Sequence, residues 1–295
     1  MNNNGSLRIS NITLRVIDLE HLIRFYVETI GFKHFKKEGS VAFLGIEGTD
    51  DPLIVLEGDP HTQPKPRRAP GLFHLAVLLE ERKDLSQLVK SIIERGAAFT
   101  GAADHGVSEA FYLEDPEGNG IELYRDRPRS EWPFSRGVLQ MGTNPLDVND
   151  LLAESDHAEK SWVGLRTGTR IGHLHLQVSE LRQSERFYND ILGLDVMQRS
   201  FPGALFLSRG GYHHHLGLNI WNSRGTGPLP AGAAGLTSFT FSFSAAEHVQ
   251  HIRDRVSSQM ASPTIANMTA NAGVDFTIED PDRINVKIAS VNLHN

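Results

Sequence analysis

The sequence contains no cysteine, which excludes disulfide bonds, thiolate metal sites and a cysteine nucleophile. Long apolar runs are also missing, since no stretch approaches the roughly 18 residues that a membrane-spanning helix needs. The first ten residues, MNNNGSLRIS, lack the charged and then apolar regions of a secretory signal. We therefore expect a cytoplasmic protein without a membrane partner.

Basic residues are outnumbered, because 29 Lys and Arg stand against 36 Asp and Glu and give a formal net charge of -7. Nucleic acids and anionic membranes bind basic surfaces that replace their counterions. The charge therefore argues against nucleic acid as a partner and favours a small-molecule function. At 295 residues, the chain is long enough for two domains that each bury a core.

Four segments have the pattern of a half-buried or fully buried strand and open four similar units. They read NITLRV at 11–16, HLAVLL at 74–79, HLHLQV at 173–178 and SFTFSF at 238–243. In the first and third units an amphipathic helix follows, DLEHLIRFYVETIGF and ELRQSERFYNDILGL, and both helices contain RFY. Gly31 and Gly193 are expected to end these helices.

The second and fourth units share a different ending, FYLEDPEGNGIELY from Phe111 and FTIEDPDRINVKIA from Phe276. An EDP turn precedes the last strand in each, and Gly118 and Gly120 are expected to supply positive φ. The chain thus predicts an α+β fold of four βαβββ modules, at 8–57, 70–124, 170–222 and 235–291.

The predicted domains are an N-terminal half (1–128) with modules one and two, a linker (129–169), and a C-terminal half (170–295) with modules three and four. Within the linker, NPLDVNDLLAE predicts a short helix capped by Asp147 or Asn149.

The motifs GLFHLAVLL, YLEDPEGNGIELY, GHLHLQV and YHHHLGLNIW resemble the vicinal oxygen chelate superfamily, most closely its catechol 2,3-dioxygenase-like branch. The resemblance covers nearly the whole chain and implies modules that pair into two cup-shaped mixed sheets. Glyoxalases and bleomycin-resistance proteins share the fold, so function has to be argued from the site.

The resemblance places metal ligands at the first residue of an opening strand and near the end of a closing strand. Modules three and four, the usual source in extradiol enzymes, carry Ser238, Lys287 and Thr277 where a His, a carboxylate and a Tyr are needed. Modules one and two offer His74 and Glu122, but Asn11 is a weaker ligand and Asp51 replaces the acid/base histidine. Modules two and three together supply a complete predicted set, His74, His173 and Glu122.

Two imidazoles and a carboxylate form the facial triad of non-haem Fe(II) enzymes, and Mn(II) is the alternative metal. The resemblance implies three further roles. His214 is the general acid/base, with His213 or His215 as alternatives on the opposite strand face. Tyr112 bonds a substrate oxygen or O₂, or else pads the core. His105 is a polar residue behind the site, or else simply exposed.

Several other side chains have both a functional and a packing interpretation. Glu122 lies within the apolar strand IELY, where a carboxylate without a cation is costly. His175 shares a strand face with His173 and is interpreted as support or packing. Trp221, Phe206 and Phe111 could wall an aromatic pocket, although core packing is the simpler interpretation.

These observations together predict an extradiol dioxygenase that cleaves a small catechol-type aromatic with O₂ on Fe(II). We also expect the protein to be a homo-oligomer. One rival is a glyoxalase-type isomerase, for which His214 or a neighbour would give a fourth ligand. The other is a metal-free binding protein like the bleomycin-resistance members, which would have no physical need for a His/His/Glu set.

Overall fold

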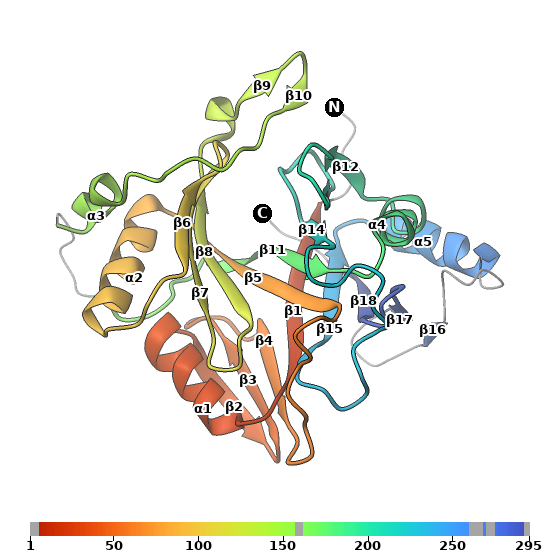
Figure 1. Cartoon of the computed structure of the whole chain (residues 1–295), viewed down its shortest axis with the longest axis horizontal. Helices are drawn as coiled ribbons and strands as arrows, with labels where there is room; N and C mark the ends of the chain where they lie inside the picture. The colour runs from red at the N-terminus through yellow and green to blue at the C-terminus, as the bar shows by residue number, and fades with distance from the viewer. Residues whose placement is uncertain (1–5, 157–161, 260–267, 270–274, 292–295) are drawn as a thin grey trace. The chain divides into compact units, whose positions relative to one another are not determined.

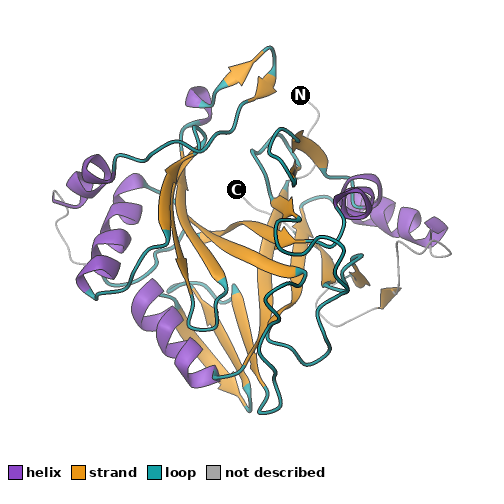
Figure 2. Cartoon of the chain, viewed as in Figure 1, coloured by secondary structure: helices purple, strands orange, loops and turns teal. Residues whose placement is uncertain are grey.

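The computed structural model describes residues 6–156, 162–259, 268–269 and 275–291. Its elements follow the βαβββ order four times along the chain (Figure 1). Strands and loops dominate over helices, so the α+β prediction is confirmed (Figure 2). Among the described residues, no helix combines the length and apolar character needed to cross a membrane.

The first two modules have the predicted order of elements. Module one consists of β1 (Leu7–Val16), α1 (Leu19–Arg24), the π-helical segment η1 (Phe25–Ile30), β2 (Lys33–Glu38), β3 (Val41–Gly45) and β4 (Ile54–Gly58). Module two consists of β5 (Gly71–Leu79), α2 (Arg82–Glu94), β6 (Gly101–Asp104), β7 (Ser108–Glu114) and β8 (Gly120–Asp126).

The last two modules repeat this order. Module three consists of β11 (Arg170–Gln177), α4 (Leu181–Glu185), the π-helical segment η3 (Arg186–Ile191), β12 (Asp195–Gln198), β13 (Ala204–Ser208) and β14 (Leu216–Asn219). Module four consists of β15 (Gly235–Phe243), α5 (Ala246–Gln259), β16 (Met268–Thr269), β17 (Phe276–Glu279) and β18 (Asn285–Ser290).

The segment between modules two and three carries η2 (Arg129–Glu131), β9 (Phe134–Ser135), β10 (Val138–Leu139) and α3 (Val148–Asp156). The predicted linker helix is therefore present. Asp147 directly precedes it and its Oδ1 accepts a hydrogen bond from the Asp150 N–H at 3.0 Å, which makes Asp147 the capping residue.

The chain divides into two compact units. The first unit comprises Met1–Arg15, Gln63–Phe73 and His173–Asn295, and the second comprises Val16–Thr62 and His74–Gly172. Strands β1, β5 and β11 continue from one unit into the other. The assignment of the chain to two sequence halves remains a prediction.

Strand pairing within each unit follows the modules. In the second unit β5 pairs in parallel with β8, and β7 and β6 extend this sheet in antiparallel order. In the first unit β11 pairs in parallel with β14, and β15 pairs in parallel with β18. Strand β1 of module one pairs with β15 of module four. The opening strand of modules two, three and four thus lies beside the closing strand of the same module.

The RFY and EDP motifs contact each other. The hydroxyl of Tyr26 donates to Asp115 Oδ2 at 3.1 Å, and that of Tyr188 donates to Asp280 Oδ2 at 2.7 Å. In both turns the other carboxylate oxygen accepts two backbone N–H groups that follow it. The tyrosine of modules one and three therefore binds the turn of modules two and four, respectively.

The glycines of the EDP turn behave differently from one another. Gly118 has φ +79° as predicted, but Gly120 was assigned wrongly, because it begins β8 and is not among the positive-φ residues. In module four, Arg283 takes the position of Gly118 and has φ +66°. One left-handed residue is therefore enough for this turn.

Asp280 should make stability depend on pH. Burial raises its pKa from 3.8 to about 7, and the neighbouring Asp282 adds to the shift. Between about pH 4 and 7 the folded protein holds the Asp280 proton that the unfolded chain has already released. The free energy of unfolding therefore falls as pH rises through this range, by up to about 1.4 kcal/mol per pH unit. Urea unfolding of Asp280→Asn should lack this loss, so the variant gains stability relative to the wild type toward pH 7.

Asp254→Asn is the matched control, because Asp254 is exposed on α5 and its change removes the same formal charge. The control should follow the wild-type pH profile. If Asp280→Asn also follows that profile, Asp280 does not titrate in this range.

Candidate metal centre

One face of the β5/β8/β7 sheet carries a buried carboxylate among apolar side chains. Ala76 of β5 and Tyr112 of β7 lie opposite Glu122 of β8 in the strand register. The same face holds a buried cluster of Ala76, Leu78, Ala110 and Tyr124, against which Tyr112 packs. Glu122 is only 2% exposed, so its charge is costly without a cationic or hydrogen-bonding partner.

His74 lies next to this carboxylate. It belongs to β5 and is 7% exposed, and its Nε2 lies 3.0 Å from Glu122 Oε2. Since strand side chains alternate, His74 and Ala76 share a face, and Ala76 is the register partner of Glu122. The local sheet geometry therefore brings the first two predicted ligands together.

Gly172 explains how the third ligand approaches. A Cβ atom at this position would lie 2.7 Å from Tyr124 Cζ and 3.0 Å from Leu78 Cβ, both on the face that carries Glu122. Only glycine lets the β11 backbone come this close to that face. The next residue is His173, which is 1% exposed.

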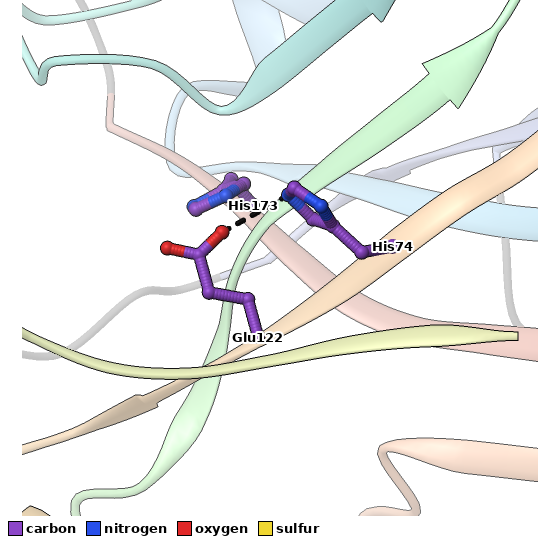
Figure 3. Close-up of side chains that lie close together, drawn as sticks. All are labelled: His74, Glu122 and His173. Carbon is purple, nitrogen blue, oxygen red and sulfur yellow. Dashed lines mark ion pairs between the residues drawn. The ribbon is translucent and has the colours of Figure 1, made fainter. Parts of the chain in front are cut away.

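His74, Glu122 and His173 form a His/His/Glu group whose ligand atoms all lie within 4.8 Å of one another. Their imidazoles and carboxylate point toward one another from β5, β11 and β8, respectively (Figure 3). Metal bonds of about 2.0–2.2 Å place neighbouring ligand atoms about 3 Å apart, which matches the separation of 3.0 Å between His74 and Glu122. Among the described residues no other group meets this ligand criterion.

Tyr112 and His105 form a hydrogen-bonded pair beside Glu122. His105 Nε2 lies 2.6 Å from the Tyr112 hydroxyl, and its Nδ1 lies 2.6 Å from the carbonyl oxygen of Gly142. Because a carbonyl only accepts, His105 Nδ1 carries a proton, which leaves Nε2 as the ring atom that contacts the Tyr112 hydroxyl. Burial, and then the charge of Glu122, raise the pKa of Tyr112. The tyrosine is thus held as a neutral hydroxyl.

The strand alternation expected for Tyr212–His215 is wrong, because β14 begins only at Leu216 and the preceding residues form a bend. Both His213 and His214 therefore lie near His173, with ring centroids 6.1 and 4.1 Å away. Their Nδ1 atoms are hydrogen-bonded to each other at 2.8 Å. His215 instead bonds Ser208 Oγ at 2.9 Å.

Of the three aromatic residues considered for a pocket, Phe111 belongs to the core, whereas Phe206 and Trp221 do not. Phe111 is 2% exposed and packs edge-on against Phe99, so it belongs to the core. Phe206 is half-buried and Trp221 is 49% exposed, so neither is a core residue.

The sequence analysis did not identify two residues that shape the candidate metal centre, Gly172 and Gly142. Gly172 had a visible signal, since a glycine inside a strand often marks a close backbone approach. The carbonyl of Gly142 had none, because any residue supplies a carbonyl and only the path of the linker brings it to His105.

Modules one and four present a different set of side chains at the equivalent positions. Asn11 Oδ1 accepts a hydrogen bond from Thr240 Oγ1 at 3.0 Å, and the buried Ser238 lies opposite Thr13 and Asn285. Lys287 lies opposite Thr240 on β18. A cationic amine at this position disfavours a bound metal ion.

Known proteins resemble the chain over most of its length. The family model described as Glyoxalase/Bleomycin resistance protein/Dioxygenase superfamily matches residues 8–123 and 170–288. Catechol-2,3-dioxygenase of Bacillus subtilis (strain 168) is 43% identical over 247 residues, which are 82% of this chain and 85% of that protein.

Two solved structures are similar in fold. A protein from Bacillus subtilis subsp. subtilis str. 168 has a TM-score of 0.66 at 12% identity and covers 97% of this chain and 86% of its own. Glyoxalase I from Zea mays has a TM-score of 0.59 at 18% identity and covers 97% and 93%. Likeness at such identity concerns the fold alone.

Proposed function

Since the chain belongs to the glyoxalase/bleomycin resistance protein/dioxygenase superfamily, we propose that it is an extradiol dioxygenase that opens a catechol-type ring with O₂. The observation that carries the proposal is the buried group of His74, His173 and Glu122, which has the donor set of a non-haem Fe(II) site. The 43% identity to a catechol dioxygenase supports the same reaction.

His74, His173 and Glu122 would hold the metal ion, and Mn(II) would suit the same donors. Bound iron would supply adjacent open positions for the substrate oxygens and O₂ and let electron density pass between them. The charge of Glu122 offsets part of the charge of the cation, and the burial of all three ligands limits competition from water.

His214 is the proposed general acid/base. Its ring lies 4.1 Å from that of His173, close enough for a substrate beside the ligand to reach it. A histidine with a near-neutral pKa can take a proton from a catechol hydroxyl and return it when the ring opens. His213 is the alternative, since its Nδ1 is bonded to that of His214 and it lies on the same side.

Tyr112 is proposed to hydrogen-bond an oxygen atom of the substrate or of O₂. His105 positions the tyrosine through Nε2 and is itself fixed by the Gly142 carbonyl. A hydroxyl whose orientation is fixed before the reaction stabilises developing charge without a reorganisation cost.

The test loads the protein with Fe(II) without air, adds catechol and then admits air. We expect one O₂ consumed per catechol and a yellow ring-fission product that contains both oxygen atoms, since the C–C bond beside the two hydroxyls is cleaved. Product from a hemithioacetal with Ni(II) or Zn(II), without O₂ uptake, would instead identify an isomerase. Neither product nor bound metal would identify a binding protein.

A further inference from the structure

A second buried carboxylate lies on β7, on the sheet face opposite to Tyr112. Glu109 is 2% exposed and, because strand side chains alternate, it points away from the face that carries Tyr112. Arg82 Nε and Arg125 Nε lie 2.9 and 2.8 Å from its Oε2. Arg127 Nη2 lies 3.4 Å from its Oε1. Several charge-assisted hydrogen bonds to one carboxylate offset the cost of burying it, so these four side chains hold one another in place.

Arg127 connects this charged cluster to the turn that precedes β7. Its Nη2 lies 2.8 Å from Asp104 Oδ2, and Asp104 Oδ1 accepts the Gly106 N–H at 2.8 Å. Burial raises the pKa of Asp104, but the Gly106 N–H and Arg127 outweigh this effect, so the pKa lies below its usual value. Asp104 is therefore held as a carboxylate. His105 lies between Asp104 and Gly106 in the chain, so this carboxylate fixes the turn that carries it.

Asp104 also holds the linker. Its backbone N–H donates to the Asn144 carbonyl, and the Asn144 N–H donates to the Asp104 carbonyl, both at 2.9 Å. Two residues earlier in the linker, the Gly142 carbonyl accepts from His105 Nδ1 at 2.6 Å. The Gly142 N–H donates to the His105 carbonyl at 3.2 Å. The position of the Gly142 carbonyl therefore depends on the same residue that binds Arg127.

The next part of the linker meets the charged cluster across a cavity of about 400 Å³. The cavity is lined by Arg82, Asp104, Glu109, Arg125, Arg127, Pro145, Leu146, Asp147 and Asp150. Arg82 also reaches α3, where its Nη2 lies 2.6 Å from Asp150 Oδ2 and its Nη1 lies 3.1 Å from Glu154 Oε1. Charged side chains line most of the cavity, so ionic contacts rather than apolar packing hold this part of the linker.

We infer that Asp104 and Arg127 are positioning residues for the proposed reaction and act on Tyr112 through His105. The inference rests on the proposed function, because the direction of the Tyr112 hydroxyl matters only if it bonds the substrate or O₂. Arg127 holds the carboxylate of Asp104, which fixes the turn and the linker. The turn and the Gly142 carbonyl then fix the His105 ring, whose Nε2 lies 2.6 Å from the Tyr112 hydroxyl.

Hydrogen exchange of the His105 Nδ1–H tests the positioning without catalysis. The full chain is labelled with ¹⁵N-histidine and loaded with diamagnetic Zn(II), and the signal is assigned by its loss in His105→Gln. We expect slow exchange in the wild type, because the Nδ1–H is bonded to a carbonyl. Arg127→Met should speed the exchange by about tenfold, the effect of one lost charge-assisted hydrogen bond at a half-buried site. Arg127→Lys should recover part of this loss.

The fold should survive Arg127→Met, because Glu109 keeps Arg82 and Arg125 as partners. In O₂-uptake assays of the Fe(II) enzyme, kcat should fall by about tenfold while KM for catechol and iron retention stay unchanged, since Tyr112 is assigned to the reacting state. Asp104→Asn should have a similar effect. The double variant should be no worse than either single variant, because both changes break the same ion pair.

Arg199→Met is the matched control, because Arg199 Nη1 donates to Glu185 Oε2 at 2.7 Å in an arginine–glutamate pair of module three. It should change neither the exchange rate nor kcat. Wild-type exchange in Arg127→Met, faster exchange with unchanged kcat, or additive losses in the double variant would overturn the positioning role. Absence of O₂ uptake by the wild type would overturn the proposed reaction, while the exchange rates would still show whether Arg127 fixes His105.

Discussion

Glu122→Gln is expected to lower the affinity for Fe(II) by more than about a hundredfold, because removal of groups that only support a ligand already costs about 10–100-fold. The change keeps the size of the side chain but removes the negative charge opposite His74 Nε2. His173→Ala should have a similar effect, since it removes a buried imidazole from the same group. Metal analysis after gel filtration measures the retained iron.

Ser238→Ala and Lys287→Ala are the matched controls, because they change the equivalent opening and closing positions of module four. Both should retain iron as the wild type does. Retention by Glu122→Gln and His173→Ala, or loss in the controls, would show that the ligands come from other modules.

Gly172→Ala is expected to reduce both stability and iron retention. The new methyl group would collide with Tyr124, which is fully buried, and with Leu78. Overpacking of this kind costs about 1–3 kcal/mol. Because His173 follows directly, a shift of the β11 backbone that relieves the collision would also move this ligand, and displacement by about 0.5 Å is enough to impair a site.

Gly101→Ala is the control for this substitution, because Gly101 also lies in a strand and a Cβ there would meet no atom within 4 Å. Urea unfolding and metal analysis of Gly101→Ala should give the same stability and iron retention as the wild type. The double variant Gly172→Ala/Tyr124→Phe removes the hydroxyl oxygen that the methyl would strike and should recover part of the loss. Iron retention in Gly172→Ala equal to that of the wild type would rule out this glycine as a positioning residue.

The fold could be predicted from the sequence because each module combines strand alternation, helical spacing and turn residues in the same order. Module three was expected at 170–222, and its strands run from Arg170 to Asn219. The π-helical segments η1 and η3 were not foreseen. A π turn differs from an α turn by one residue per hydrogen-bonded ring, which a short apolar pattern does not resolve.

The proximity of His74, His173 and Glu122 could be predicted, because each is an unusual residue at a repeated position. Side-chain directions could not be predicted where strand alternation ends. The three histidines of Tyr212–His215 precede β14, so their directions depend on the path of a bend rather than on a period of two. The contact of His105 with Gly142 likewise depends on the course of the linker.

The pairing of β1 with β15 has a consequence for protein design. Asn11 lies opposite Thr240, which lies opposite Lys287, so three neighbouring strands of one unit carry these positions side by side. The Tyr–Asp contacts that join the modules are located elsewhere, at Tyr26 and Tyr188. These positions of modules one and four are therefore the counterpart of the proposed ligand positions, where new donor groups could be introduced without changing the Tyr–Asp contacts between modules.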